Sequence, residues 1–167
     1  MDYLSPAQQN IYSLSELLGQ QLLARHWHVA TAESCTGGAI AAAITQVAGS
    51  SAWFEYGVVT YANRAKQHLL EVQDATLAEA GAVSEAVVVE MARGALALSR
   101  ADMAVAVSGI AGPTGGSADK PVGTVWFAWA LASGEVQTQK LLLPGDRIAV
   151  QLQAVEHGLR GLLDFIP

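Results

Sequence analysis

The first regular pattern along the chain is a set of apolar residues at helical spacing near the N-terminus, namely Leu14, Leu17, Leu18 and Leu22. Residues three and four positions apart share one face of a helix, so this pattern predicts an amphipathic helix over about residues 7–25. Residues 28–33, HVATAE, are expected to form a short strand. Gly37 and Gly38 then lead into a second helix, which is rich in alanine and isoleucine.

The middle of the chain alternates between strand and helix patterns. Residues 53–61, WFEYGVVTY, are aromatic and β-branched, which favours a strand. Asn63 is expected to cap the helix that follows, and Ser84 is expected to cap the helix SEAVVVEMARGALALSR. The run at residues 104–108, AVAVS, is almost continuously apolar, as a buried parallel strand would be.

The last part of the chain predicts a hairpin and a final helix. Two strand-like runs, residues 124–131 and 136–143, flank Ser133 and Gly134, which is typical of a β-hairpin. Asp146 is expected to begin the last helix. Strands that alternate with helices, together with one hairpin, predict an α/β protein, a three-layer α/β/α single domain with a mixed β-sheet.

The composition is that of a compact globular protein. The chain has 167 residues, of which 51% are hydrophobic and 14% are charged, and this length can bury a core without disulfides. We therefore expect a single domain over residues 1–167, with residues 1–10 as a flexible N-terminal segment. The low charge content also favours self-association, and we expect a homo-oligomer, with a dimer as the preferred state.

Charge and cysteine content narrow the function classes. A formal net charge of −6 argues against nucleic acid or an anionic membrane as the main partner, although a local basic pocket can still hold a phosphate. Cys35 is the single cysteine, which excludes an internal disulfide and a multi-cysteine metal site. No apolar run reaches the length of a membrane span, and the N-terminal residues MDYLSPAQQN do not resemble a signal peptide. We expect a cytoplasmic protein.

Residues with chemical potential follow three of the predicted strands. TAESCTGG comes after the first strand, YANRAK after the second and SGIAGPTGG after the third. In open α/β sheets, ligands bind where the carboxyl ends of strands meet loops and helix N-termini. The three segments therefore predict one pocket, built from parts of the chain that are far apart in sequence.

The first segment carries Ser34, Cys35 and Thr36 directly before two glycines. Free backbone N–H groups at the start of a helix can hold a phosphate or stabilise an oxyanion. Ser34 or Thr36 can equally serve only as a helix cap, and the residues alone leave both interpretations open. The spacing matches neither the G-x-S-x-G motif nor a P-loop.

Lys66 is the candidate base for Ser34. A desolvated lysine loses its proton readily and can deprotonate a serine. The alternative, which the residue alone leaves open, is that Lys66 is a solvated surface lysine. The four histidines are each interpreted as structural or surface residues, namely His26, His28, His68 and His157. A Ser/Lys pair is therefore favoured over a Ser/His/Asp arrangement.

Two further features can hold an anion. The loop GPTGGSADK, Gly112 to Lys120, offers exposed N–H groups, little side-chain bulk and a lysine, but it is equally compatible with an ordinary flexible connection. Arg147 follows the expected cap Asp146 and can bind a phosphate through two parallel hydrogen bonds. The alternative is a surface arginine, which is unusual in a first helical turn because a cation opposes the helix dipole there.

Five separated motifs together resemble the CinA C-terminal-domain family. They are TAESCTGG, AGSSAWFEYGVVTYANRAK, GAVSEAVVVEMA, SGIAGPTGGSADKPVGTVWFA and the PGDR turn. Within that family, the chain is similar to the stand-alone nicotinamide-nucleotide amidohydrolases. The resemblance extends from about residue 10 to about residue 160, and the motifs occur in the family's order.

The resemblance implies hydrolysis of the carboxamide of nicotinamide mononucleotide to nicotinic acid mononucleotide and ammonia. It also implies a role in pyridine nucleotide recycling, a small-molecule nucleotide as the substrate, and neither a metal nor a cofactor. The family's catalytic positions fall on the nucleophile Ser34, on Lys66 and on Tyr61. The implied substrate-binding residues are Cys35, Thr36, Gly37, Gly112, Thr114, Gly115, Gly116 and Arg147.

Two alternatives remain open from the residues. The first is a nucleotide-binding or interaction module of the same fold without turnover, in which Ser34 acts only as a helix cap. The second is an amidase for another small amide. Release of ammonia from nicotinamide mononucleotide discriminates between these functions.

Overall fold

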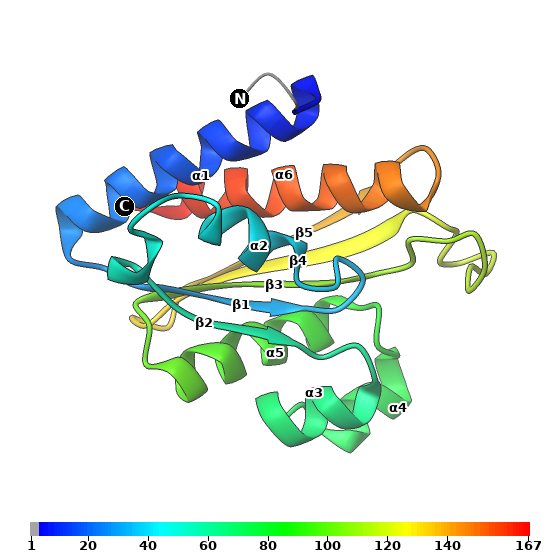
Figure 1. The fold of residues 1–167 in the computed structure, drawn as a ribbon. Helices are drawn as coiled ribbons and strands as arrows, with labels where there is room; N and C mark the ends of the chain where they lie inside the picture. Colours follow the sequence, from blue (N-terminus) through cyan, green and yellow to red (C-terminus); the bar gives the residue numbers. More distant parts are fainter. Residues whose placement is uncertain (1–3) are drawn as a thin grey trace.

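A mixed β-sheet forms the centre of the molecule, which this computed structural model describes for residues 4–167 (Figure 1). Its strands are β1 (Val29–Glu33), β2 (Phe54–Val59), β3 (Met103–Gly109), β4 (Thr124–Leu131) and β5 (Val136–Leu142). They lie in the order β2-β1-β3-β4-β5. β1 pairs in parallel with β2 and β3, whereas β4 pairs antiparallel with β3 and β5. The buried parallel strand and the hairpin predicted from sequence are both present.

Helices cover both faces of this sheet, as Figure 1 shows. One face carries α1 (Pro6–Arg25), α2 (Ala39–Thr45) and α6 (Arg147–Phe165). The other carries α3 (Asn63–Leu70), α4 (Asp74–Ala80) and α5 (Glu85–Ser99), and a short 3₁₀ helix, η1 (Ser50–Ala52), precedes β2. The predicted α/β fold with three layers and a mixed sheet is confirmed.

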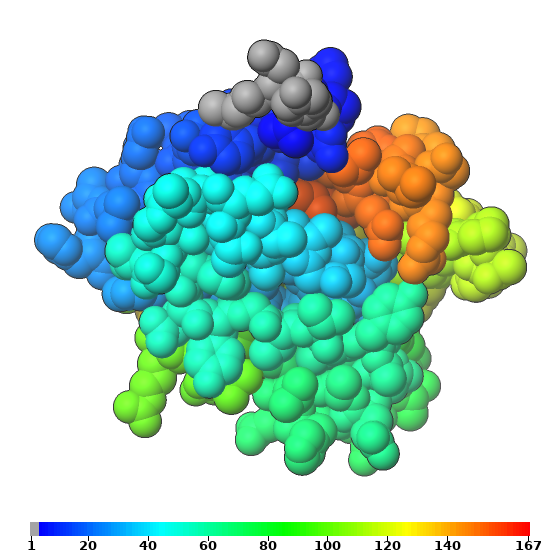
Figure 2. Space-filling view, viewed as in Figure 1, coloured from blue at the N-terminus to red at the C-terminus, as the bar shows by residue number. Residues whose placement is uncertain are grey.

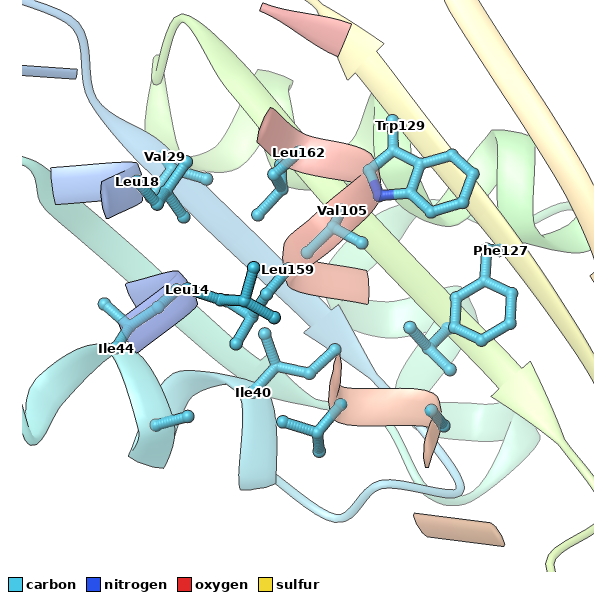
Figure 3. Close-up of a cluster of buried hydrophobic side chains, with 14 of the residues drawn as sticks. Leu14, Leu18, Val29, Ile40, Ile44, Val105, Phe127, Trp129, Leu159 and Leu162 are labelled. Carbon is cyan, nitrogen blue, oxygen red and sulfur yellow. The ribbon is translucent and has the colours of Figure 1, made fainter. Parts of the chain in front are cut away.

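The strands separate two hydrophobic cores because successive side chains of a strand point to opposite faces. Val105 of β3, labelled in Figure 3, belongs to the core beneath α1, α2 and α6, and so does Val107 of the same strand. Ala104 and Ala106, which alternate with them, belong to the core beneath α5. Their small side chains let α5 pack close to the sheet. The core beneath α1, α2 and α6 contains the stacked rings of Phe127 and Trp129, whose centroids are 5.7 Å apart.

The helix starts test the predicted caps. Ser84 caps α5, since its side chain accepts a hydrogen bond from the N–H of Val87, and Asp146 caps α6 in the same way through Ala149. Asn63, in contrast, does not cap α3: it is the first helical residue, and Ala62 occupies the cap position without a side-chain bond. That prediction was wrong. The backbone turns one residue earlier than the sequence pattern suggested.

The N-terminal part of α1 corrects a further expectation. We expected residues 1–10 to form a flexible segment, but residues 6–10 are the first turns of α1. Ser5 and Gln8 close this end of the helix with reciprocal side-chain to backbone hydrogen bonds, and a proline opens the first turn. Residues 1–3 lie outside the described part of the chain.

Candidate active site

The three segments that follow β1, β2 and β3 meet at one cavity of about 330 Å³. Figure 2 shows the loop after β3 (yellow-green) beside the start of α6 (orange) at the right of the molecule. The lining residues are Ser34, Cys35, Tyr61, Asn63, Lys66, Ala82, Val83, Ser108, Gly109, Ile110, Ala111, Gly112, Thr114, Gly115 and Arg147. The structure therefore has the single pocket, built from segments that are distant in sequence, that the sequence predicted.

Ser34 lies at the end of β1, where the chain leaves the sheet. Its backbone N–H donates to the carbonyl of Val107, which continues the parallel ladder by one bond beyond the pair Glu33 and Val107. Successive residues alternate between faces, so Ser34 points away from the side chain of Glu33. This geometry directs the serine toward the cavity and toward α3.

The buried carboxylate of Glu33 organises the turn that follows Ser34. One oxygen accepts from the Thr36 hydroxyl at 2.6 Å and from the N–H groups of Gly38 and Ile40, and the other accepts from Ala41 at 2.8 Å. A carboxylate at this position satisfies the free N–H groups of the short helix α2. Neither Ser34 nor Thr36 caps that helix. Glu33 therefore acts as an acceptor that holds the scaffold of this turn.

Lys66, on α3, lies within hydrogen-bonding distance of Ser34. Its Nζ lies 3.1 Å from the Ser34 hydroxyl oxygen and 2.7 Å from the carbonyl oxygen of Thr60. The residue is only 1% exposed. Among residues 4–167, no carboxylate oxygen lies within 4.0 Å of this amine. Burial therefore lowers the pKa of Lys66 below its usual value.

The position of α3 depends on a close contact with α5. A Cβ at Gly94 of α5 would lie 2.2 Å from the carbonyl oxygen of Leu70, so only glycine allows the end of α3 to approach this closely. At the other end, Thr60 donates its N–H to the carbonyl of Glu33, and its own carbonyl holds Lys66. Lys66 is thus placed by contacts at both ends of its helix.

Cys35 also lines the cavity, but its environment keeps the thiol protonated. Its side chain is 5% exposed, and burial is the main reason that the pKa of its thiol rises to about 12. A thiol is a good nucleophile only as the thiolate, which this environment disfavours. The carbonyl of Cys35 accepts a hydrogen bond from the Gln151 side chain at 2.8 Å, which ties the turn to α6.

Arg147, at the start of α6, joins two of the three segments. Its guanidinium donates to the carbonyl of Gly112 at 2.9 Å and to the Tyr61 hydroxyl at 3.0 Å. Tyr61 is 61% exposed and therefore stands at the mouth of the cavity. These bonds use only part of the guanidinium's five N–H donors, so the side chain keeps donors for an anion in the cavity.

Three of the residues implied as substrate-binding do not line the cavity. The Thr36 hydroxyl is turned to Glu33, Gly37 is exposed on the surface of the turn, and Gly116 packs against the backbone N–H of Val122. Lys120 of the same glycine-rich loop also points elsewhere, since its Nζ donates to the carbonyl of Ala80 at the end of α4. Arg147 lines the cavity and Lys120 does not, so Arg147 is the candidate cation for a phosphate.

The sequence prediction did not include Ala82 and Val83, which line the cavity but lie outside the three predicted segments. Asn63 and Ser108 lie inside these segments, but neither was singled out as a site residue. The strand register contains a signal for Ser108. Because Glu33 pairs with Val107 across two parallel strands, the residues that follow them, Ser34 and Ser108, are also neighbours. The turn at Ala82 gave no comparable sequence signal, since its role depends on where α5 begins.

Within residues 4–167, no three side chains of His, Cys, Asp or Glu gather into a group that can hold a metal ion. No helix in the described range is both long and apolar enough to cross a membrane.

Solved structures of similar proteins share this fold. A competence/damage inducible protein, CihA, from Agrobacterium tumefaciens superimposes with a TM-score of 0.91 at 44% identity, covering 93% of this chain and 94% of that one. A competence-damaged protein (CinA) superfamily protein from Escherichia coli has a TM-score of 0.91 at 37% identity, covering 98% of this chain and 94% of that one.

Sequence comparison gives the same family. The chain is 59% identical to the nicotinamide-nucleotide amidohydrolase PncC of Escherichia coli K12, over 91% of this chain and 92% of that protein. It is 54% identical to the protein of the same name from Pseudomonas putida, over 92% and 95% of the two chains. The model of the CinA C-terminal domain matches residues 11–166. The chain belongs to the CinA C-terminal domain family.

Proposed function

We propose that this protein hydrolyses the carboxamide of nicotinamide mononucleotide to nicotinic acid mononucleotide and ammonia. The observation that carries the proposal is the contact between Lys66 Nζ and the Ser34 hydroxyl, 3.1 Å long and inside a cavity that also holds Arg147. The curated relatives named nicotinamide-nucleotide amidohydrolase support the substrate class. Such a reaction would recycle nicotinamide mononucleotide into the pyridine nucleotide pool as nicotinic acid mononucleotide.

Ser34 is the nucleophile in this proposal, and Lys66 is its base. A neutral lysine amine accepts the serine proton through its lone pair while one of its own N–H groups donates to the Thr60 carbonyl at 2.7 Å. The serine oxygen then attacks the carboxamide carbon and forms a tetrahedral intermediate. Burial of Lys66 favours the neutral amine that this step needs.

The negative oxygen of that intermediate requires nearby N–H donors. The N–H of Ser34 is already bonded to the Val107 carbonyl, so we assign the oxyanion to the N–H groups that follow, first that of Cys35 and then that of Thr36. The backbone N–H of the residue directly after a nucleophile is a common oxyanion donor. Glu33 keeps this turn fixed through its bonds to Thr36 and α2.

Collapse of the intermediate breaks the carbon–nitrogen bond. Lys66, now an ammonium group, returns its proton to the leaving nitrogen, and ammonia departs. A water molecule then attacks the acyl-serine, Lys66 accepts a proton from that water, and the proton returns to Ser34 as the acid product leaves. The proton is conserved over the cycle, and every transfer uses residues within the cavity.

The nucleotide's phosphate is assigned to Arg147 and the Gly112–Gly115 loop. Arg147 lies at the edge of the cavity, and its guanidinium geometry suits a phosphate. Tyr61 bonds to this guanidinium, so in this proposal its hydroxyl orients Arg147 at the cavity mouth. This places the phosphate at the rim and the carboxamide at Ser34.

The test is the reaction itself with purified protein. Nicotinamide mononucleotide should yield equal amounts of ammonia and nicotinic acid mononucleotide, with and without a chelator. Ser34→Ala protein, with an unchanged circular dichroism spectrum, should give neither product. Tight nucleotide binding by the unmodified protein without turnover would instead support a binding module, and turnover of other small amides only would support a different amidase.

A further inference from the structure

Ser108 is a buried polar residue of the cavity for which the mechanism above has no use. It follows Val107 on β3, as Ser34 follows Glu33 on β1, and the two strands pair in parallel with Glu33 opposite Val107. Paired residues of neighbouring strands point to the same face of the sheet. Ser108 and Ser34 therefore lie side by side on the face that carries Lys66, and both line the cavity.

The hydroxyl proton of Ser108 is already in use. Its Oγ donates to the carbonyl of Ala82 at 2.7 Å, and the residue is only 1% exposed. The acceptor is held firmly, because Ser84 bonds back to the Gly81 carbonyl and Lys120 bonds to the Ala80 carbonyl in the same turn. A hydroxyl has one proton and two lone pairs. Ser108 therefore offers the cavity only acceptor sites.

An acceptor beside the nucleophile discriminates between an amide and an acid. The carboxamide nitrogen of the substrate carries two N–H donors, whereas the carboxylate of the product carries only acceptor oxygens. A lone pair that faces an N–H is stabilising, and a lone pair that faces a carboxylate oxygen is repulsive. A contact of this kind also fixes which end of the carboxamide faces Ser108, and it leaves the carbonyl oxygen for the N–H of Cys35.

We propose that Ser108 determines specificity by accepting a hydrogen bond from the carboxamide nitrogen of the substrate, which favours the amide nucleotide over the acid product. The inference rests on the proposed function and adds to it a residue that orients the leaving nitrogen. The same contact favours release of the product, because hydrolysis replaces the amide N–H donors that face Ser108 with a carboxylate oxygen, which is an acceptor.

The test compares binding of the two nucleotides in a background that cannot turn over. Dissociation constants of nicotinamide mononucleotide and nicotinic acid mononucleotide are measured by calorimetry with Ser34→Ala protein and with the double variant Ser34→Ala/Ser108→Ala. The second substitution should weaken binding of the amide nucleotide roughly 3- to 10-fold, the usual effect of one lost hydrogen bond. Binding of the acid nucleotide should be unchanged or tighter, so the ratio of the two constants changes.

A matched control separates this role from a structural one. Ser99 is also buried and donates to a backbone carbonyl at 2.7 Å, that of Ala95, but it does not line the cavity. Ser99→Ala in the same background should leave the ratio unchanged. If Ser108→Ala weakens both nucleotides equally, or neither, Ser108 only ties the Ala82 turn to β3 and the inference is overturned. Absence of turnover by the unmodified enzyme would overturn the proposed function instead, which is measured separately.

Discussion

The side-chain nitrogen of Lys66 lies 3.1 Å from the hydroxyl oxygen of Ser34, and the lysine is almost fully buried. A lysine normally keeps its charge in water, with a pKa of about 10.4. Here burial lowers that pKa, and no carboxylate in residues 4–167 lies close enough to compensate the charge. In the proposed mechanism, the neutral amine of Lys66 is the base that activates the hydroxyl of Ser34, which is otherwise a poor nucleophile.

Substitution of the two adjacent candidate nucleophiles separates their roles. Ser34→Ala should lower kcat by at least about 10³-fold, because it removes the hydroxyl that contacts Lys66 and forms the acyl intermediate in the proposed mechanism. Cys35→Ala should keep most of the activity, since the raised pKa of the thiol, about 12, keeps it protonated. Steady-state kinetics of both variants checks this expectation. A Cys35→Ala enzyme without activity beside an active Ser34→Ala enzyme would reverse the assignment.

Arg147 should control the preference for a phosphorylated substrate. A charge-assisted hydrogen bond to phosphate contributes about 1.5–3 kcal/mol, so Arg147→Ala should reduce kcat/KM for the mononucleotide roughly 10- to 150-fold. The effect on nicotinamide riboside, which lacks the phosphate, should be much smaller. Arg160, an exposed arginine in the same helix, provides the control Arg160→Ala. An unchanged preference for nucleotide over riboside in Arg147→Ala would exclude Arg147 as the phosphate ligand.

Glu33 should contribute strongly to stability, although it does not enter the chemistry. Its carboxylate accepts four hydrogen bonds in a fully buried position, and Glu33→Gln replaces one accepting oxygen by a donor that faces N–H groups. We expect the free energy of unfolding to fall by about 3 kcal/mol. Urea denaturation measures this, with Glu79→Gln on the surface of α4 as the control. A loss no larger than the control's would contradict the scaffold role.

The pH dependence of stability provides an independent measure of the buried lysine. The folded-state pKa of Lys66 is lowered, so between that pKa and about 10.4 the unfolded chain binds more protons than the folded one. The stability of the wild type should therefore rise with pH across this window, and Lys66→Met should lack that rise. The difference in unfolding free energy, variant minus wild type, should be largest at low pH and shrink toward about pH 10.

Urea titrations at a series of pH values measure that difference. Lys140 of β5 is exposed, so Lys140→Met should show a difference from wild type that stays constant over the same range. A constant difference for Lys66→Met as well would mean that its ammonium form is not penalised by burial.

The layers of the fold were predictable because their signals are local. Helical spacing marked α1, continuous apolar character marked β3, and Ser84 and Asp146 marked two helix starts. α4 was not predicted, because none of its side chains is buried and its sequence carries no apolar stripe. Asn63 was misplaced by one residue, since the cap preference of asparagine does not decide where the backbone turns.

The site was predictable only as far as its segments lie at strand ends. That rule brought the segments of Ser34 and Lys66 together without a structure, whereas Arg147 was predicted from its place after the cap Asp146 and from the family resemblance. The orientation of side chains within the loops is not local: Lys120 turns to the end of α4, and Tyr61 contacts Arg147. Each of these contacts joins positions whose proximity depends on the folded chain, which a motif cannot reveal.

The most direct test of the central claim is the pH dependence of kcat for the wild-type enzyme and for Lys66→Met, with nicotinamide mononucleotide at saturating concentration. The lowered pKa of Lys66 predicts that wild-type kcat rises with pH and reaches a plateau below the pKa of a free lysine, because the neutral amine is the active form. Lys66→Met should lose this limb and most of kcat while it still binds the nucleotide. Lys66→Arg should not restore activity, since a guanidinium stays protonated. An unchanged rising limb in Lys66→Met, or near-normal kcat in Lys66→Arg, would contradict the account.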